Sequence, residues 1–484
     1  MEIPGRIRRG ENMRLATRFP LACLVSILVT SSLALGQETQ KTAEYRALKA
    51  YIDSIPAIDT HDHLRPFDRL SGYVQTERGY GMNLYGLLST SYFEWINSIP
   101  PWKPGGKFTD WWAQEKPNFD NVRATNFYRY LLPAFRDLYG VDYDHITDAQ
   151  AQELDGRIFE NYRDRKWVED VVTRRSNIEL MLIDPYWAKL DFHSFYKFGV
   201  LVFNVSSLLH GFHPSEFKDP LDNPYRLADQ WHFPVKSLDD YLALLDRLCG
   251  EAKAGGAVSL NDDDTAYERT LQFDRVPKEV AARVFGRPRT ELTAQEVKAF
   301  EDFTMWQLVG LSAKYELPLQ IHTGAGRIQG SNPMLLMDMI EANPQTKFLL
   351  MHGGYPWIGE TGAMVMASIP HAANLWIDSC WLPTISYTMA KRAYQEWLEV
   401  MPSNRILWGS DLHHAEGIYA ATEFTRRCLA EALAEKIIHG DLTEEEARHI
   451  GRQIMRENAL SLFPRLRTKL WRTGDQSEPP AGHD

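Results

Sequence analysis

Four histidines and one aspartate have the types and the spacing of a metal site. His61 and His63 stand one residue apart in "PAIDTHDHLRP", and side chains at i and i+2 of an extended chain point to the same side. His322, His352 and Asp411 each end a short apolar run, in "QIHTG", "LLMHGG" and "LWGSD". Imidazoles and a carboxylate around an open position form a catalytic site for a divalent ion, most simply Zn²⁺. Such an ion lowers the pKa of a bound water to about 7 and polarises a carbonyl group.

Each residue alone also has a structural explanation. A single histidine beside a strand usually makes hydrogen bonds within the fold, and an aspartate before a helix usually caps it. A His-x-His pair also arises by chance. The joint pattern is stronger, because all five residues fall at the ends of runs selected only for being apolar. The sequence therefore predicts a divalent metal site.

The elements that position these residues are eight apolar runs with helix-like stretches between them. Their apolar character is continuous and does not alternate, which is typical of strands buried on both faces. The runs are residues 55–58, 178–184, 199–207, 256–262, 317–324, 347–354, 374–380 and 405–411.

The spacing of the runs favours an α/β fold. A strand, a helix and the return need about 30 residues, and His322 and His352 are 30 residues apart. Eight such units predict a (β/α)8 TIM-type barrel, in which the carboxyl ends of the strands form the site. A doubly wound sheet is the weaker alternative, because no glycine-rich phosphate turn follows the first strand.

Two segments exceed this plan, and we expect both over the barrel mouth because both follow strand ends. Residues 64–177 form a long helical insertion after the first strand, rich in aromatic side chains, and residues 262–300 form a smaller one. The barrel domain is predicted over residues 37–470, with 471–484 as a flexible tail. Thr443 and the glutamate three residues later match a capping box that opens a closing helix.

Residues 1–36 have the layout of a secretory signal peptide. Five arginines precede an apolar stretch that ends in small residues near Gly36. About 18 apolar residues can also span a bilayer, so an uncleaved anchor is the alternative. The small-residue end favours cleavage and export to the periplasm or the medium. Met1 and Met13 are both candidate starts.

Composition restricts the partners of the protein. Its 53 basic and 64 acidic residues give a net charge of −11, which offers no basic face for nucleic acid. Cys249, Cys380 and Cys428 remain after signal cleavage, and their odd number and wide spacing predict buried thiols. We expect a small-molecule substrate, no nucleic acid and no membrane contact after cleavage, and leave self-association into a homo-oligomer open.

The motifs together resemble the amidohydrolase superfamily of metal-dependent barrels. His61-x-His63, "QIHTG", "LLMHGGYP" and "LWGSD" occur in the order of that family, over roughly residues 50–465. The most similar branch is the amidohydrolase-related group. It contains decarboxylases such as aminocarboxymuconate-semialdehyde decarboxylase and the amidohydrolase-like half of fungal glutamine-synthetase fusion proteins, to which "LPLQIHTGAG…SNPMLL" is especially similar.

The resemblance implies roles for the five residues. His352 matches a histidine that binds a second metal in binuclear members and is catalytic in mononuclear ones. Binuclear members carry a carbamylated lysine at the end of the fourth strand, where this sequence has Asn261, which cannot be carbamylated. We therefore expect one divalent ion, Zn²⁺. The implied ligands are His61, His63, His322 and Asp411.

Hydrolysis is the function that the resemblance favours. A metal-activated water, deprotonated with help from Asp411, would attack an amide, ester or lactone carbon while His352 steadies the oxyanion. Non-oxidative decarboxylation of a conjugated or aromatic acid is the alternative. A sugar-acid isomerase is a third, since uronate isomerases also carry a long insertion after the first strand. An exported binding protein with an inactive barrel is disfavoured, because all five chemical positions hold competent residues.

Further residues near the expected mouth are candidates for contact with the substrate. Arg327 could pair with a substrate carboxylate, and Trp357 and Trp381 could wall the pocket. His413 and His414 follow Asp411, where helix capping is the structural alternative. The predicted substrate-binding set is Arg327, Asp378, His210 and Trp357.

Overall fold

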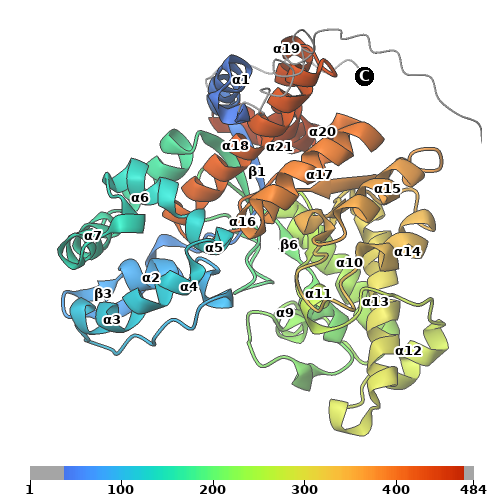
Figure 1. Ribbon diagram of the computed structural model, residues 1–484. Helices are drawn as coiled ribbons and strands as arrows, with labels where there is room; N and C mark the ends of the chain where they lie inside the picture. The colour runs from blue at the N-terminus through green and yellow to red at the C-terminus, as the bar shows by residue number, and fades with distance from the viewer. Residues whose placement is uncertain (1–37, 474–484) are drawn as a thin grey trace, which may run out of the picture.

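The computed structural model describes residues 38–473 (Figure 1). The predicted signal peptide, residues 1–36, and most of the predicted tail lie outside the described residues. All eight predicted strands are present, and the third is split by Val202 into two short strands. The barrel strands are β1 (Ala57–Asp62), β4 (Ile178–Ile183), β5 (Gly199–Leu201), β6 (Phe203–Asn204), β7 (Leu260–Asp262), β8 (Leu319–Ile321), β9 (Phe348–Leu350), β10 (Leu375–Asp378) and β11 (Ile406–Leu407).

The strands form a closed parallel ring. The order β1-β4-β5 continues, through Val202, into β6-β7-β8-β9-β10-β11. The ring closes between the first and last strands, where Thr60 N–H donates to the Trp408 carbonyl at 3.2 Å and Asp411 N–H to the His61 carbonyl at 3.0 Å. A Cβ on Gly409 would lie 2.9 Å from the His61 nitrogen, so glycine permits this approach. The predicted barrel is confirmed.

Helices alternate with most of the strands and cover the outside of the ring (Figure 1). Residues 184–198, between β4 and β5, are the exception and contain no helix. This stretch instead forms a loop that leads from the carboxyl end of β4 back to the amino end of β5. The outer helices are α10 (Leu238–Ala254), α13 (Ala294–Tyr315), α14 (Met337–Glu341), α15 (Ile358–Ser368), α17 (Tyr387–Val400) and α18 (Ala415–His439).

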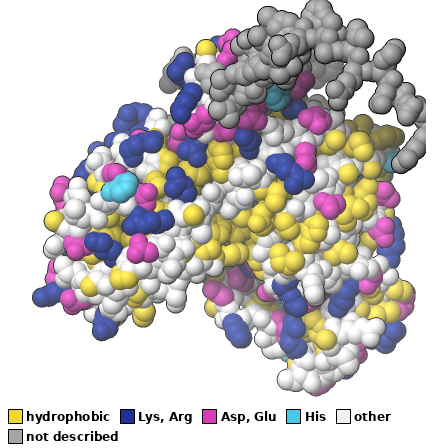
Figure 2. Space-filling model, viewed as in Figure 1, with side chains coloured by type: hydrophobic (Ala, Val, Ile, Leu, Met, Phe, Trp, Pro, Cys, Tyr) yellow, Lys and Arg dark blue, Asp and Glu magenta, His cyan; other side chains and the backbone are white. Residues whose placement is uncertain are grey.

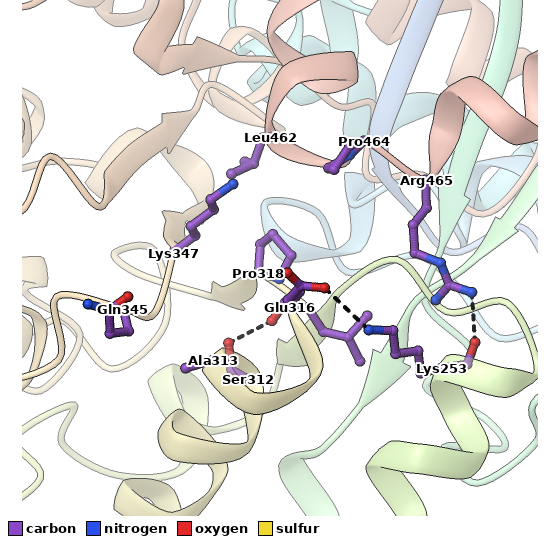
Figure 3. A pocket seen from close by; sticks show the side chains of 11 residues that line it. Lys253, Ser312, Ala313, Glu316, Pro318, Gln345, Lys347, Leu462, Pro464 and Arg465 are labelled. Carbon is purple, nitrogen blue, oxygen red and sulfur yellow. Dashed lines mark hydrogen bonds and ion pairs between the residues drawn. The ribbon is translucent and has the colours of Figure 1, made fainter. Parts of the chain in front are cut away.

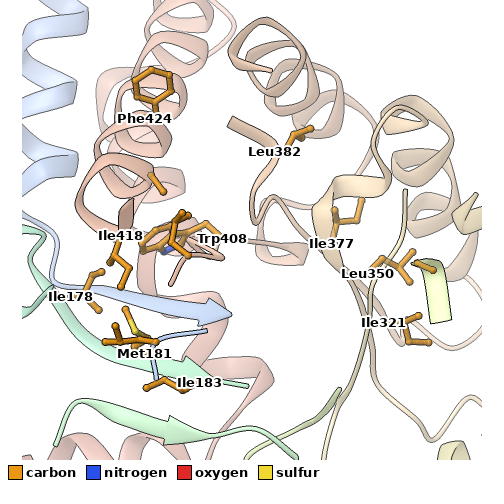
Figure 4. Close-up of a cluster of buried hydrophobic side chains, with 14 of the residues drawn as sticks. Ile178, Met181, Ile183, Ile321, Leu350, Ile377, Leu382, Trp408, Ile418 and Phe424 are labelled. Atoms are coloured by element: carbon orange, nitrogen blue, oxygen red, sulfur yellow. The ribbon is translucent and has the colours of Figure 1, made fainter. Parts of the chain in front are cut away.

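Alternate strand residues divide between two buried clusters, which explains why the runs are continuously apolar. One cluster fills the barrel and includes Ile58, Leu182, Val202 and Leu349. The other packs the strands against the helices, and Figure 4 shows part of it, where side chains of β4 lie next to Ile418 of α18. Burial on both faces is the pattern expected of a parallel barrel.

The amino-terminal and carboxy-terminal helices pack together at one side of the barrel (Figure 1). The predicted capping box is confirmed, because the Thr443 side chain accepts from the Glu446 N–H and Glu446 accepts from the Thr443 N–H. The three described cysteines are buried free thiols, as predicted. These helices are α1 (Ala43–Ser54), α19 (Glu444–Arg452), α20 (Asn458–Leu462) and α21 (Leu466–Thr473).

The first insertion is a helical lobe beside the barrel, and the surface is hollowed between it and the lobe that carries α9 (Pro224–Gln230) and α12 (Lys278–Val284) (Figure 2). The smaller insertion also contains α11 (Thr265–Glu268), and α16 (Leu382–Ile385) follows β10. Among the described residues, no helix has the length and apolarity to cross a bilayer. The first insertion comprises β2 (Val74–Thr76), β3 (Gly79–Gly81), α2 (Leu84–Leu88), α3 (Phe108–Glu115), α4 (Phe119–Val122), α5 (Asn126–Arg129), α6 (Leu132–Tyr139), α7 (Asp148–Asn161) and α8 (Arg165–Asp170).

Candidate metal centre

The structure brings the five predicted residues together at the carboxyl ends of the strands. The Nε2 atoms of His61 and His63 lie 3.3 Å apart. Asp411 Oδ1 lies 3.2 Å from His63 Nε2 and 3.8 Å from His61 Nε2. His352 Nε2 lies 3.0 Å from Nδ1 of His322, and its Nδ1 lies 3.6 Å from Asp411 Oδ2.

This donor set fits a divalent ion. Ligand atoms about 2.1 Å from a tetrahedral zinc lie roughly 3.4 Å from each other, and the His61, His63 and Asp411 atoms are spaced close to that value. Nε2 of His322, which is buried, has no hydrogen-bond partner among the described residues, and neither has Nδ1 of His61 or of His63, on the other side of each ring from Nε2. Buried polar atoms are rarely left in that state. The residues present therefore suit a metal, although its number and identity stay predictions.

The electrostatics of His61, His322 and Asp411 favour the protonation states that bind metal. His63 differs, because burial lowers its pKa but the hydrogen bond to Asp411 and the nearby carboxylates outweigh burial and raise that pKa well above its usual value. Burial lowers the pKa of His61 to about 3, with the nearby His63 adding to the effect, so this imidazole is neutral at neutral pH. Burial also places the pKa of His322 well below its usual value. Burial raises the pKa of Asp411, but the hydrogen bond from His63 and the charge of His352 outweigh it, and the pKa lies well below its ordinary value. Neutral imidazole and ionised carboxylate are the ligating forms.

Two carboxylates that the sequence reasoning missed also lie at this site. Asp263 follows β7, and its Oδ1 lies 3.0 Å from His322 Nδ1. Asp184 follows β4 and accepts from the Asn204 and Asn261 amides at 2.9 and 2.7 Å. Two sets of three residues have ligand atoms close enough to hold one ion. The first set is His61, Asp263 and His322, and the second is His61, His63 and Asp411. The signal for both aspartates was their position at the end of a buried strand.

Four residues around the centre have left-handed backbone conformations. Tyr92, His352, Trp381 and Asp411 have φ values of 60°, 62°, 61° and 60°. Such values are strained for residues with a side chain, and they occur preferentially where function needs a particular orientation. The Trp381 ring lies 5.2 Å from that of His352 and 4.7 Å from that of Tyr92. The four residues thus form one contiguous group at the metal centre.

Both insertions reach the centre. The Tyr92 hydroxyl, from the first insertion, donates to Asp411 Oδ1 at 3.0 Å. The Tyr267 hydroxyl, from α11 in the second, lies 3.5 Å from His352 Nε2. Each insertion therefore contributes a tyrosine hydroxyl to the centre, and their position over the barrel mouth stays a prediction.

The predicted substrate-binding residues are not gathered around the centre. Arg327 is exposed and donates to the Glu268 carbonyl at 2.7 Å. His210 lies between the Glu301 and Glu268 carboxylates, at 3.1 and 3.2 Å. Substrate contact by these residues stays a prediction without support from their contacts.

The remaining candidates differ in their placement. Asp378 is buried, accepts from the Thr60 hydroxyl and the Cys380 N–H, and has its pKa raised to about 7 by burial. Trp357 precedes α15, and the tryptophan ring beside His352 is Trp381 instead. His414 caps α18 by accepting from the Gly417 N–H at 3.1 Å, which confirms the structural alternative for that residue.

A separate cavity of about 310 Å³ lies at the opposite end of the barrel (Figure 3). Its lining includes Pro318 and Lys347, which immediately precede β8 and β9, and Arg465 beside α20. Lys253 pairs there with Glu316 at 3.6 Å. The amino-terminal end of such barrels carries stability and not catalysis.

Comparison with known proteins gives a family match. A family model described as amidohydrolase matches residues 219–465, which include His322, His352 and Asp411. Protein fluG of Emericella nidulans is 28% identical over 193 residues, covering 38% of this chain. The chain spans only 22% of the length of that relative.

Solved structures share the fold. The crystal structure of a uronate isomerase from Thermotoga maritima has a TM-score of 0.66 at 13% identity, covering 87% of this chain and 97% of the other. The crystal structure of a protein from Lactobacillus casei, described as a metal-dependent hydrolase, has a TM-score of 0.60 at 16% identity. The match covers 87% of this chain and 98% of the other. At these identities the likeness establishes the barrel and not the reaction.

Proposed function

The chain belongs to the amidohydrolase family, and on that premise we propose that it is a metal-dependent hydrolase acting on an amide, ester or lactone bond of a small substrate. His61, His63, His322 and Asp411 would hold one divalent ion, Zn²⁺. The ion supplies Lewis-acid activation of the substrate carbonyl and of water. The protein supplies the base, the charge that steadies the oxyanion, and a site shielded from solvent.

The position of Asp411 carries this proposal. It is 2% exposed, and its carboxylate contacts His63 on one oxygen and approaches His352 on the other. The low pKa of this carboxyl keeps it ionised, so it can accept a proton from water. A carboxylate base within reach of both a metal ligand and a second titratable side chain supports hydrolysis.

His352 supports the developing negative charge. Its pKa is lowered by burial, so the ring is neutral at neutral pH and can donate one N–H. Nδ1 faces the Cys380 carbonyl at 3.4 Å, and Nε2 lies towards His322 and the Tyr267 hydroxyl. A preorganised donor beside the reacting carbonyl stabilises an oxyanion without reorganisation.

Isomerisation of a sugar acid is the second candidate. The likeness to the uronate isomerase of Thermotoga maritima covers 87% of the chain, so it reaches into the insertion after β1. Decarboxylation is a third, in which His352 protonates a carbanion and carbon dioxide leaves. Both reactions would use the same centre as hydrolysis, so only the products formed from a substrate can distinguish the three.

The test is metal analysis of purified protein followed by a substrate screen. Dipeptides, lactones, aromatic acids and sugar acids are incubated with the zinc-loaded protein, with the Asp411→Asn variant as the matched control. Incorporation of ¹⁸O from labelled water into a product supports hydrolysis. Carbon dioxide release, or aldose–ketose conversion without ¹⁸O transfer to a new carboxylate, would contradict it.

We also propose that the enzyme is exported and acts on an external nutrient, because residues 1–36 have the layout of a signal peptide. The mature chain should begin near residue 37. Amino-terminal sequencing of exported protein tests this, and a sequence that starts at Met1 or Met13 contradicts it.

A further inference from the structure

Arg65 is a cation without a carboxylate partner beside the metal centre. It follows His63 by two residues, and its Nη2 donates to the Tyr186 hydroxyl at 2.9 Å. Its guanidinium carbon lies 4.9 Å from the Tyr186 ring centre and 5.4 Å from that of Trp187. Among the described residues, the Arg65 guanidinium donates only to this neutral hydroxyl, and its buried Nε lacks a hydrogen-bond partner.

This state is unusual for a half-buried guanidinium. Arginine carries five N–H donors and no acceptor, and its fork matches a carboxylate in a bidentate manner. Arg269, also half-buried, pairs with Glu301 at 2.9 Å and with Asp302. Arg65 makes one hydrogen bond to a neutral hydroxyl instead. The remaining donors of Arg65 are therefore available to an acidic ligand.

Arg65 lies on the side from which the centre is reached. His63 is 6% exposed, whereas His61 and His352 are 0% exposed. The His63 ring meets the Tyr186 ring edge-on at 4.9 Å and stacks with the His413 ring at 5.3 Å. Tyr186 and His413 are both partly exposed. A substrate that approaches past His63 thus passes between two aromatic rings.

The geometry also sets a distance. The Tyr186 ring centre is 4.9 Å from the His63 ring centre and 4.9 Å from the guanidinium carbon of Arg65. One aromatic ring therefore separates the cation from the nearest ligand. A substrate whose carboxylate is bound by Arg65 can place its reacting bond at the metal centre only if that bond lies about one aromatic ring from the carboxylate. The substrate must therefore be small.

The position of Arg65 is fixed by the fold. The Tyr196 hydroxyl donates to the Arg65 carbonyl at 2.8 Å, and the preceding residue, Leu64, donates its N–H to Asp62 Oδ1 at 2.8 Å. Tyr186 and Tyr196 both come from the loop that replaces the helix between β4 and β5. The guanidinium is held by contacts that do not need a ligand, as expected of a preorganised site.

We propose that Arg65 binds the carboxylate of a small acidic substrate, with Tyr186 and His413 as the walls of its path. This inference rests on the proposed function and names the substrate class of that site, namely acids whose carboxylate lies about one aromatic ring from the bond that reacts. It assigns to Arg65 the role that the sequence suggested for Arg327.

The experiment measures binding and not turnover. Zinc-loaded protein is titrated calorimetrically with dicarboxylates from malonate to adipate, and with glutaramide as a neutral molecule of the same shape as glutarate. Arg65→Met keeps an apolar side chain on the Tyr186 and Trp187 rings without the charge, and Arg65→Lys keeps the charge without the fork. Arg405→Met is the matched control, because Arg405 also stacks on a tryptophan, at 4.1 Å, but precedes β11 at the far end of the barrel.

The tightest-binding acid should bind Arg65→Met about ten- to a hundredfold more weakly than wild type, since a charged hydrogen bond is lost. Arg65→Lys should be intermediate and Arg405→Met unchanged. Glutaramide should bind all four proteins equally weakly. Metal content and melting temperature should not change in either Arg65 variant.

Equal affinity of the acids for wild type and Arg65→Met would overturn the proposal, as would the absence of saturable binding of any acid in the series to wild type. A repeat on metal-free protein separates Arg65 from the metal, because the dependence on Arg65 should persist there. If acids bind through Arg65 but no hydrolysis is found, the proposed function fails and this inference stands. If neutral substrates are hydrolysed and Arg65→Met does not change their turnover, the proposed function stands and this inference fails.

Discussion

The hydroxyl of Tyr92 donates a 3.0 Å hydrogen bond to Oδ1 of Asp411, across 319 positions of sequence. The same carboxylate oxygen faces His63 at 3.2 Å. Tyr92 belongs to the first insertion and Asp411 to the carboxyl end of β11, and both have left-handed backbone conformations. The first insertion therefore contributes a hydrogen-bond donor to the metal centre.

Replacing Tyr92 by phenylalanine tests this relationship. Loss of a hydrogen bond to an ionised group costs about 1.5–3 kcal/mol, so we expect turnover to fall about ten- to a hundredfold with metal content retained. The acid limb of the pH profile should move upwards, because the carboxylate loses a donor that stabilises its charged form. Steady-state kinetics across pH provide the measurement.

Tyr73→Phe is the control for that variant. Tyr73 lies in the same insertion and donates to the Tyr162 carbonyl at 3.4 Å, away from the metal ligands. Its loss should leave turnover and the pH profile unchanged. Equal effects of the two changes would show that the insertion acts only through its stability.

Metal removal tests the number of ions. We expect one equivalent of Zn²⁺ per active chain, since Asn261 cannot be carbamylated and instead donates to Asp184. Chelation should abolish activity and lower the melting temperature, because an ion that binds only the folded state stabilises that state. Mass spectrometric metal analysis and thermal melts before and after re-addition of zinc provide the readouts.

Asp263→Asn distinguishes one ion from two. Asp263 Oδ1 lies 3.0 Å from His322 Nδ1, where a carboxylate could serve a second ion. With one ion on the predicted ligands, this variant should keep its zinc content. Two equivalents in active wild-type protein, with one lost on the Asp263 change, would refute the single-ion hypothesis.

The barrel could be predicted because its strands are buried on both faces, which leaves continuous apolar runs in the sequence. The five chemical residues followed from their place at the ends of those runs. Asp184 and Asp263 occupy equivalent places but were missed, because a lone aspartate after a strand carries less metal signal than a histidine. Tyr92 could not be found, since no local pattern reports which residue of an insertion of more than a hundred residues folds back onto β11.

The prediction for Arg327 also shows that local sequence does not reveal which loop residues reach the metal centre. A cation after His322 is close to the centre in sequence, but the loop directs it to the Glu268 carbonyl. Arg65 follows His63 by two residues, whereas Arg327 follows His322 by five, and Arg65 stays beside the centre. The difference depends on loop conformations set by long-range packing, such as the hydrogen bond from Tyr196, and not on residue type.

His210 provides a prediction about pH and stability. Burial lowers its pKa, but hydrogen bonds to Glu268 and Glu301 outweigh this and raise it to about 9, against 6.5 for an ordinary histidine. Because the folded value is the higher one, the stabilisation is complete below pH 6.5 and is lost as the pH rises through about 9. His210→Gln should therefore lower the free energy of unfolding by about 1–3 kcal/mol at pH 6 and by little at pH 10.

Denaturant unfolding at the two pH values measures this difference. His213→Gln is the matched control, because His213 lies three residues away and the hydrogen bonds of its ring among the described residues are both to Ser215. A loss of equal size at pH 6 and pH 10 would show that the contribution of His210 is packing and not charge.

The last prediction separates chemistry from metal binding at His352 and Asp411. His352 faces His322 and Asp411 but has no place in the predicted ligand set, so His352→Asn should keep metal and fold. Turnover should fall by about 10²–10⁴-fold, the usual loss of acid–base or oxyanion assistance. Asp411→Asn should be worse in a hydrolase, since it removes a ligand charge together with the base.

Metal content, melting temperature and turnover of both variants decide between the roles. Zinc retained with turnover lost in His352→Asn assigns the residue to the reaction. Near-normal turnover would remove His352 from the mechanism. Its role would then be to hold the ring of His322 in place, 3.0 Å from its own Nε2. Zinc loss would instead make His352 a ligand and reopen the hypothesis of a second ion, because Asp411 reaches His352 with Oδ2 and His63 with Oδ1.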